Sequence, residues 1–143
     1  MAPMIGTSLD RYRDAGLLIL RVGVGLSFLI LQGLRKFQAG EDTLITVGSA
    51  MGHLGITSGY YWWGVAAATA ESAGATLLAL GFFFRPATLA MLFVMIMAAI
   101  DQSTRPMPVI VHPLVNASMF AGLFLIGPGR YSLDALFGGR RYT

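Results

Sequence analysis

Four apolar stretches dominate this sequence and limit what the chain can fold into. They run from about 15 to 34, from 61 to 84, from 86 to 102 and from 110 to 126. A helix needs about 20 apolar residues to cross the hydrocarbon core of a bilayer, and the first two stretches meet that length. The last two are short, and a bundle that thins the bilayer locally can hold them. We therefore predict an all-α membrane protein, a four-transmembrane-helix bundle that forms a single domain over residues 1–143.

The composition favours lipid over water as the solvent of the surface. The chain is 55% hydrophobic and 12% charged, whereas a soluble domain has about 25% charged residues. No cysteine is present, which excludes disulfides, thiolate metal sites and cysteine-ligated iron–sulfur clusters. The net charge of +3 comes from dispersed basic residues and not from a basic stripe, so we expect no nucleic-acid partner.

The longest connection, about 35 to 60, carries a weak helical signal. Asp42 or Thr43 could cap a short helix that continues through His53, and a rough apolar face accompanies these positions. Two interpretations are open for this connection between the first two membrane helices. It forms either an interfacial helix that lies on the membrane or over the mouth of the bundle, or an irregular loop.

The basic residues predict an orientation. In a four-span bundle, the N-terminus, the turn between the second and third spans, and the C-terminus share one side. That side carries Arg11, Arg13, Arg85, Arg130, Arg140 and Arg141. The other side carries Arg35, Lys36 and Arg105. Because cytoplasmic loops carry the excess of Lys and Arg, we predict that both termini are cytoplasmic.

Arg21 and Glu71 are charged residues inside apolar stretches. A charge at the bilayer centre costs about 3 kcal/mol on insertion scales, so such residues usually face a partner or a wet cavity. Counted from the ends of their stretches, their depths differ by less than about 10 Å. We therefore predict an Arg21–Glu71 ion pair. It is either a staple between two helices or part of a polar pocket that binds a headgroup or relays protons, unless one of the two side chains snorkels to an edge.

A polar stripe on the first apolar stretch favours the pocket. Arg21, Gly25, Phe28 and Gln32 lie at i, i+4, i+7 and i+11, on one face of a helix. Lys36 lies somewhat off this stripe. For Gln32 the simpler interpretation is a plain hydrogen bond between helices.

The second apolar stretch is suited to close packing. Ala66, Ala70 and Gly74 recur every four residues, and such faces of small residues let membrane helices approach closely. Glu71 lies beside this face, so its side chain should point into protein and not into lipid.

His112 lies at the start of the fourth stretch, next to Pro113. Its imidazole could donate a proton or serve as an axial ligand, although a lone histidine at an interface usually does neither. Asp101 and Arg105 have the spacing to pair on one helix, and they could line an outer mouth with Lys36 and His112. The two histidines show no metal-ligand spacing, so we predict no metal site and no built-in cofactor.

Three motifs follow one another along the chain. The first, R-x-x-x-G-x-x-F…G-x-x-K-F, runs from Arg21 to Phe37. The second, E-x-x-G-A-x-L-L-x-L-G with a following arginine, runs from Glu71 to Arg85. The third, G-P-G-R-Y-S-L-D, runs from Gly127 to Asp134. In this order and spacing they resemble the DoxX family of small four-helix bacterial membrane proteins, over about Leu17 to Phe137.

Relatives in that family are linked to a quinone-reducing thiosulfate oxidoreductase and to membrane complexes that handle oxidative stress. The resemblance implies a protein of the bacterial inner membrane, an integral subunit of a redox or respiratory-type system that binds quinone. The pocket residues would be Arg21, Gln32, Lys36, Glu71 and His112. By position in the motifs, the residues of interest are Arg21, Lys36, Glu71 and Arg85.

The sequence leaves open whether the chain is a subunit of a quinone-linked oxidoreductase or has no catalytic role. The alternative is a non-catalytic scaffold or accessory subunit of a larger membrane complex. A carrier of small molecules or protons is less favoured, because no inverted repeat or broken helix is visible. Given the small size, we expect membrane lipids and either other membrane subunits or further copies of the chain as partners.

Overall fold

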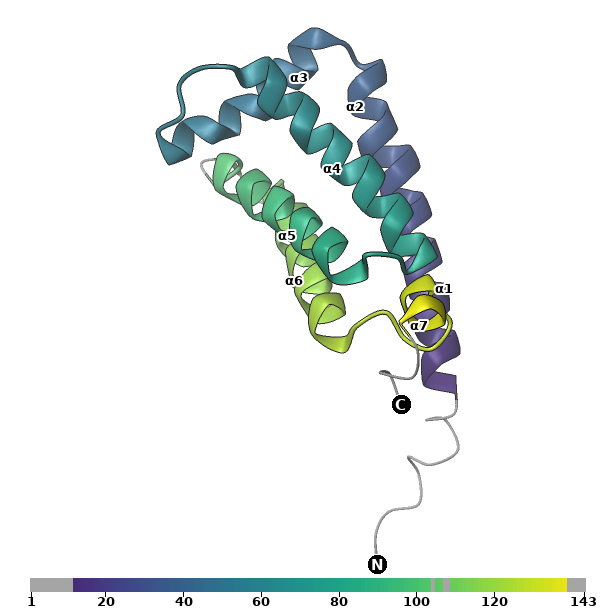
Figure 1. Cartoon of the computed structure of the whole chain (residues 1–143). Helices are drawn as coiled ribbons and strands as arrows, with labels where there is room; N and C mark the ends of the chain where they lie inside the picture. Colours follow the sequence, from purple (N-terminus) through teal and green to yellow (C-terminus); the bar gives the residue numbers. More distant parts are fainter. Residues whose placement is uncertain (1–11, 104, 107–108, 139–143) are drawn as a thin grey trace, which may run out of the picture.

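Helices make up nearly all of the part of the chain that the computed structural model describes, which is residues 12–103, 105–106 and 109–138. The first long helix is continuous through α1 (Arg13–Phe28), the π-helical segment η2 (Leu29–Gly33) and α2 (Leu34–Gln38). The other long helices are α4 (Tyr60–Leu80), α5 (Phe84–Asp101) and α6 (Val111–Ile126). These four helices overlap the four predicted apolar stretches (Figure 1), although α4 ends at Leu80 and the first helix continues to Gln38.

Two helices of the described part are long and apolar enough to cross a membrane, namely Arg13–Gln38 and Phe84–Asp101. α6 is apolar but has only 16 residues. α4 has 21 residues, many of them small, and its single acidic residue is Glu71. Large apolar side chains are exposed along the bundle, for example Ile19, Trp62 and Leu125, which are 74%, 71% and 76% exposed.

The connection after α2 is helical, so the irregular-loop interpretation is wrong. It consists of α3 (Glu41–Gly48) and the 3-10 helix η3 (Ser49–Leu54). Neither Asp42 nor Thr43 caps α3, because the helix already begins at Glu41, after Gly40 with φ of 92°. The Thr43 hydroxyl instead donates a bond back to the carbonyl of Ala39.

α3 lies across the first turns of α4 with backbone against backbone (Figure 1). A Cβ atom added at Gly48 would lie 1.8 Å from the carbonyl oxygen of Tyr60. A Cβ atom added at Gly64 would lie 1.8 Å from the carbonyl oxygen of Leu44. These two glycines therefore permit α3 and η3 to fold back over one end of the bundle.

α4 packs against α1, α3 and α5, and small residues set its distance to α1. A Cβ atom at Gly25 would lie 2.7 Å from the Cβ of Ala79, and one at Gly33 would lie 2.2 Å from the hydroxyl oxygen of Ser72. Close packing of α4 through small residues is thus present, at Ser72, Ala75 and Ala79. The predicted face takes part only at Gly74, which packs on Met91 of α5, whereas Ala66 and Ala70 line a cavity. The core beside it consists of Leu17, Phe28, Ala75, Leu78, Phe84, Met91, Met95, Phe120 and Leu123.

The opposite end of the bundle is closed by the C-terminal segment, which ends in α7 (Leu133–Phe137). The Asp134 carboxylate accepts hydrogen bonds from the backbone N–H groups of Phe83 and Phe84, at 3.0 and 2.9 Å. The carboxylate of Asp14 accepts a bond from the N–H of Arg130, at 3.1 Å. The start of α1, the α4–α5 turn and α7 therefore lie together, as Figure 1 shows.

Candidate functional site

Glu71 is a charged residue on α4 that lies inside the bundle, and its side chain is 0% exposed. One carboxylate oxygen, Oε2, lies 2.5 Å from Nζ of Lys36 on α2. The other oxygen, Oε1, is buried and has no hydrogen-bond partner among the described residues. A buried carboxylate oxygen without a hydrogen-bond donor lowers the stability of the fold. Oε1 is therefore an acceptor that a further donor could satisfy.

The predicted Arg21–Glu71 ion pair is wrong. Arg21 donates a hydrogen bond to the backbone carbonyl of Tyr131, and its guanidinium lies so close to Gly81 that a Cβ there would be 1.8 Å from Nη1. Gly81 is ten residues beyond Glu71 on the chain, which is about 15 Å along a helix. Arg21 and Glu71 thus lie at different levels of the bundle.

The error arose from the register of α1 and α4. The depth estimate assumed that the two apolar stretches enter the membrane at matching levels. In the structure, Gly25 lies against Ala75 and Ala79, and Gly33 lies against Ser72. This register places Lys36, and not Arg21, at the level of Glu71.

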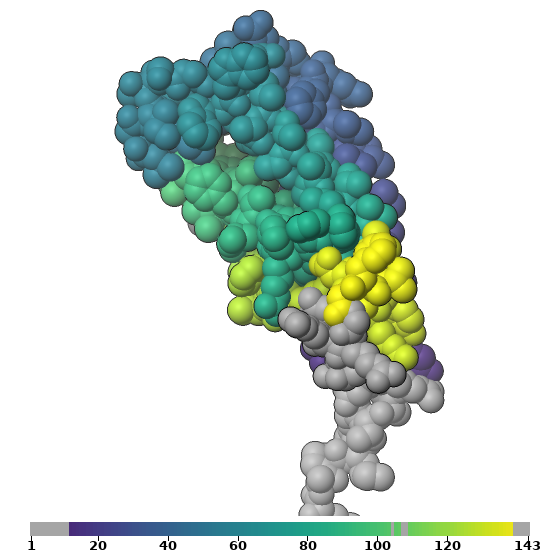
Figure 2. Space-filling view, in the orientation of Figure 1, coloured from purple at the N-terminus to yellow at the C-terminus, as the bar shows by residue number. Residues whose placement is uncertain are grey.

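A cavity of about 370 Å³ lies between α4 and α5, under α3 and η3. Figure 2 shows the surface hollowed between the α3 end of the molecule and α5. The polar members of its wall are Gln32, Lys36, Glu71, Asp101, Gln102 and His112. The remaining wall is apolar and consists mainly of alanine, methionine, valine, Phe93 and Trp63. Four of the five predicted pocket residues therefore share one cavity, and Arg21 does not belong to it.

His112 reaches the cavity wall from the first turn of α6. Its Nε2 atom lies 3.5 Å from Nε2 of Gln32 and 3.2 Å from Nδ2 of Asn116. The contact with Gln32 joins α6 to the first long helix, as the simpler interpretation of Gln32 predicted. Asn116 was missed, although a polar residue four positions after His112 lies on the same helix face.

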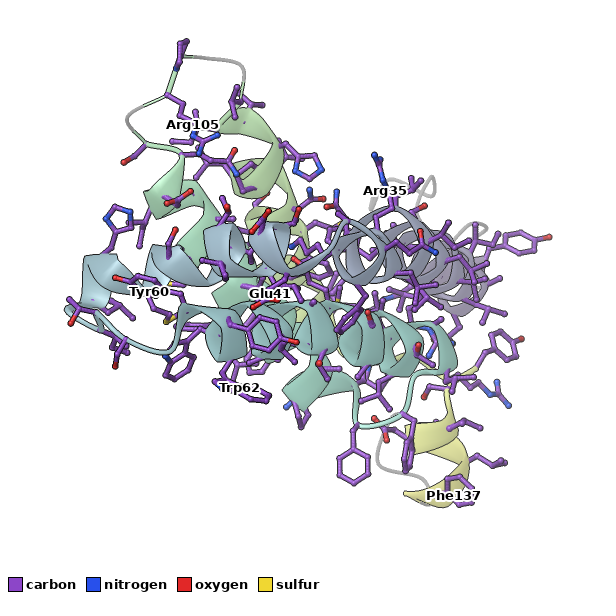
Figure 3. All side chains as sticks on the ribbon, turned by 90° about the horizontal axis from the view of Figure 1, so that it is seen from above. Arg35, Glu41, Tyr60, Trp62, Arg105 and Phe137 are labelled. Carbon is purple, nitrogen blue, oxygen red and sulfur yellow. The ribbon has the colours of Figure 1, made fainter. Side chains whose placement is uncertain are left out.

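The segment that presents Gln32 is π-helical, η2. Short π-helical turns within an α-helix are rare and occur frequently at functional sites. Gln32 and Lys36 also line a second hollow on the outside of the helix, of about 280 Å³, with Leu31, Arg35, Ala39 and Thr43. Arg35 projects away from the bundle (Figure 3), whereas its neighbour Lys36 turns inward to Glu71.

Asp101 forms the polar edge of the cavity at the end of α5. Its carboxylate lies 3.5 Å from Nε2 of His53 and 3.8 Å from Nη2 of Arg105. The predicted pairing of Asp101 with Arg105 is thus confirmed. His53 comes from η3, so this cluster connects the segment above the cavity to α5.

Arg85, the remaining motif position, lies at the closed end. Its guanidinium is 6.0 Å from the ring centre of Phe124, which is within reach of a cation–π contact. Within the described ranges, no three His, Asp or Glu side chains are placed so that they could hold a metal ion.

Comparison with known proteins identifies one family. The family model named DoxX matches residues 16–113, a range that contains the cavity residues Gln32, Lys36, Glu71 and His112. The motif from Gly127 to Asp134 lies outside the matched range. Neither a curated protein nor a solved structure matches the chain.

Proposed function

Since the chain belongs to the DoxX family, a family of membrane proteins, we propose that it is an inner-membrane subunit of a redox system and binds a quinone in the helix-lined cavity. The four long helices would all cross the bilayer, with both termini in the cytoplasm. Arg13 and Arg85 lie at the end that would face the cytoplasm. The remaining arginines predicted there include Arg11, Arg140 and Arg141, which lie outside the described residues.

The lengths of the helices support four spans of unequal depth. The first helix has 26 residues and α5 has 18, which correspond to about 39 and 27 Å. α6 is shorter, at 16 residues or about 24 Å, and would need a locally thinned bilayer. The exposed aliphatic and aromatic side chains on these helices suit contact with lipid chains.

One observation carries the quinone proposal, namely a small set of polar groups in an otherwise apolar cavity. Its volume of about 370 Å³ falls in the range of small-molecule sites, which are mostly apolar with a few convergent polar groups. Lys36 and Gln32 can donate hydrogen bonds to quinone oxygens. Phe93 and the methionines of α5 offer aromatic and thioether contacts to the ring.

Binding of a short-tailed quinone to purified protein tests this proposal. Protein in lipid nanodiscs is titrated with decylubiquinone and with a menaquinone analogue, each in its oxidised and its reduced form, and bound ligand is measured by native mass spectrometry. We expect one ligand per chain and at least a tenfold loss of affinity in Glu71→Gln, because the amide cannot keep the charged contact with Lys36. Glu41→Gln is the matched control, since Glu41 is an exposed residue at the start of α3.

Absence of saturable binding at any ligand concentration that the nanodiscs tolerate would sink the quinone proposal. Recovery of a larger complex under the same conditions, with its activity unchanged in Glu71→Gln, would favour the scaffold or accessory subunit. The Lys36–Glu71 pair would then serve assembly of the bundle alone.

A further inference from the structure

The unpaired carboxylate oxygen of Glu71 distinguishes between the oxidised and the reduced form of a quinone ligand. Oε2 is bound by Lys36 at 2.5 Å, while Oε1 is buried and has no partner among the described residues. An ionised carboxylate only accepts hydrogen bonds. Oε1 therefore lacks a hydrogen-bond donor.

None of the polar side chains in the cavity wall donates a hydrogen bond to Oε1. Ala67 and Ala70, on the preceding turn of α4, have no polar side-chain atoms. Gln32 lies against His112, and Lys36 already binds the other carboxylate oxygen. Trp63 is eight residues before Glu71, which is about 12 Å along the helix. A molecule that enters the cavity can supply the donor that Oε1 lacks.

Quinones and quinols differ in whether they can donate a hydrogen bond to Oε1. The oxygens of a quinone are carbonyls and only accept hydrogen bonds, so a quinone placed at Oε1 sets one acceptor against another. The hydroxyl groups of a quinol donate, and the same oxygens can still accept from Lys36 or Gln32. Hydrogen bonds to a charged acceptor are about twice as strong as neutral ones.

We propose, resting on the proposed function, that the cavity selects the reduced ligand, a quinol, and that one quinol hydroxyl donates to Oε1 of Glu71. Because the Glu71 side chain is 0% exposed, a neighbour must shift to admit the hydroxyl. Lys36 is the adjacent side chain with freedom to do so, since it is 19% exposed. Lys36 then holds both the carboxylate and the oxygen of the bound quinol.

The test compares three probes with the same ring substituents and tail on unmodified protein in nanodiscs under anaerobic conditions. The probes are decylubiquinol, decylubiquinone and the dimethyl ether of decylubiquinol, which keeps the ring and tail but has no hydroxyl proton. We expect the quinol to bind at least tenfold more tightly than either of the others. Because no residue is changed, this comparison does not depend on whether a variant folds.

Two variants assign the preference to Glu71. In Glu71→Gln both ligands lose a Lys36 that is held by charge. The quinol also loses its charged acceptor, whereas the new amide can donate to a quinone carbonyl, so the preference for quinol over quinone should fall below threefold. In Glu41→Gln it should remain. Equal or tighter binding of decylubiquinone to the unmodified protein, or equal binding of the dimethyl ether, would overturn the inference while leaving the quinone site in place. If none of the three probes binds, the proposed function itself has failed.

Discussion

The two ends of the α1–α4 pair each bury one charged side chain, but they surround it differently. At the closed end, Arg21 is 1% exposed and lies against the backbone of Gly81 and Tyr131, with no room for a methyl group on Gly81. At the α3 end, Glu71 is equally buried but borders a cavity of about 370 Å³.

This difference separates a structural charge from a candidate binding group. Arg21 donates a hydrogen bond to the chain itself through Nη2, and the carboxylate of Asp134 adds an electrostatic attraction. Its Nε and Nη1 atoms are buried and have no hydrogen-bond partner in the described part of the chain. The glutamate has one oxygen paired and one without a partner in the described part of the chain. Both charges are therefore only partly paired. The difference is that chain segments enclose the guanidinium of Arg21, whereas a cavity that can hold a ligand borders the carboxylate of Glu71.

Removal of Lys36, the partner of Glu71, should have the largest effect on the protein. Lys36→Met leaves a buried carboxylate unpaired, which costs about 3–5 kcal/mol in proteins. We expect a marked fall in the midpoint temperature of unfolding in detergent. The double variant Lys36→Met with Glu71→Leu should recover most of that stability, since apolar replacements of a buried pair are often neutral, but it should not bind quinol.

Recovery of both stability and quinol binding in the double variant would contradict this prediction. It would mean that the pair is neither required for the fold nor part of the site.

A methyl group added at Gly81, in the closed end of the bundle, should lower the stability of the protein. Gly81 has φ of 66°, and a Cβ there would lie 1.8 Å from Nη1 of Arg21. Gly81→Ala should therefore cost about 2–4 kcal/mol from strain and displacement of the arginine. Ligand binding in the protein that does fold should be unchanged. Gly122→Ala is the control, because no atom lies within 4 Å of its Cβ position; equal stability of the two variants would show that the closed end is not tightly packed.

The sequence predicts the helices well but their register poorly. Apolar length located all four long helices. Small residues of α4 do make its close contacts, but at Ser72, Ala75 and Ala79 and not at the predicted Ala66 and Ala70, which line the cavity. Gln32, Lys36, Glu71 and His112 were all assigned to a polar pocket, and they share one cavity in the structure. Arg21 was misplaced because apolar length does not say how far one helix slides along another.

Two further features of the site have no clear pattern in the sequence. The π-helical turn at Leu29–Gly33 has the same apolar periodicity as the α-helix around it. The position of α3 over the cavity depends on contacts between glycine backbones, at Gly48 and Gly64. Glycines are common in this chain, so nothing marked these two for a crossing of helices.

The smallest expected effect concerns the polar edge of the cavity. Asp101 is 29% exposed and pairs with two side chains that are more exposed, His53 and Arg105. Exposed ion pairs contribute about 0–1 kcal/mol, so Asp101→Asn should lower stability by no more than that. Decylubiquinol carries no net charge, so the charge of Asp101 does not steer it toward the cavity. Stopped-flow binding of decylubiquinol to the variant should therefore show a change of less than threefold in affinity.

Asp14→Asn is the matched control for that measurement, since Asp14 is an acidic residue bound to a backbone N–H at the closed end. It should leave both the rate and the affinity of quinol binding unchanged. A loss of affinity in Asp101→Asn as large as that in Glu71→Gln would place the ligand at the edge of the cavity. The contrast between Arg21 and Glu71 would then no longer explain where the chain binds, because the binding charge would lie near solvent and not inside the bundle.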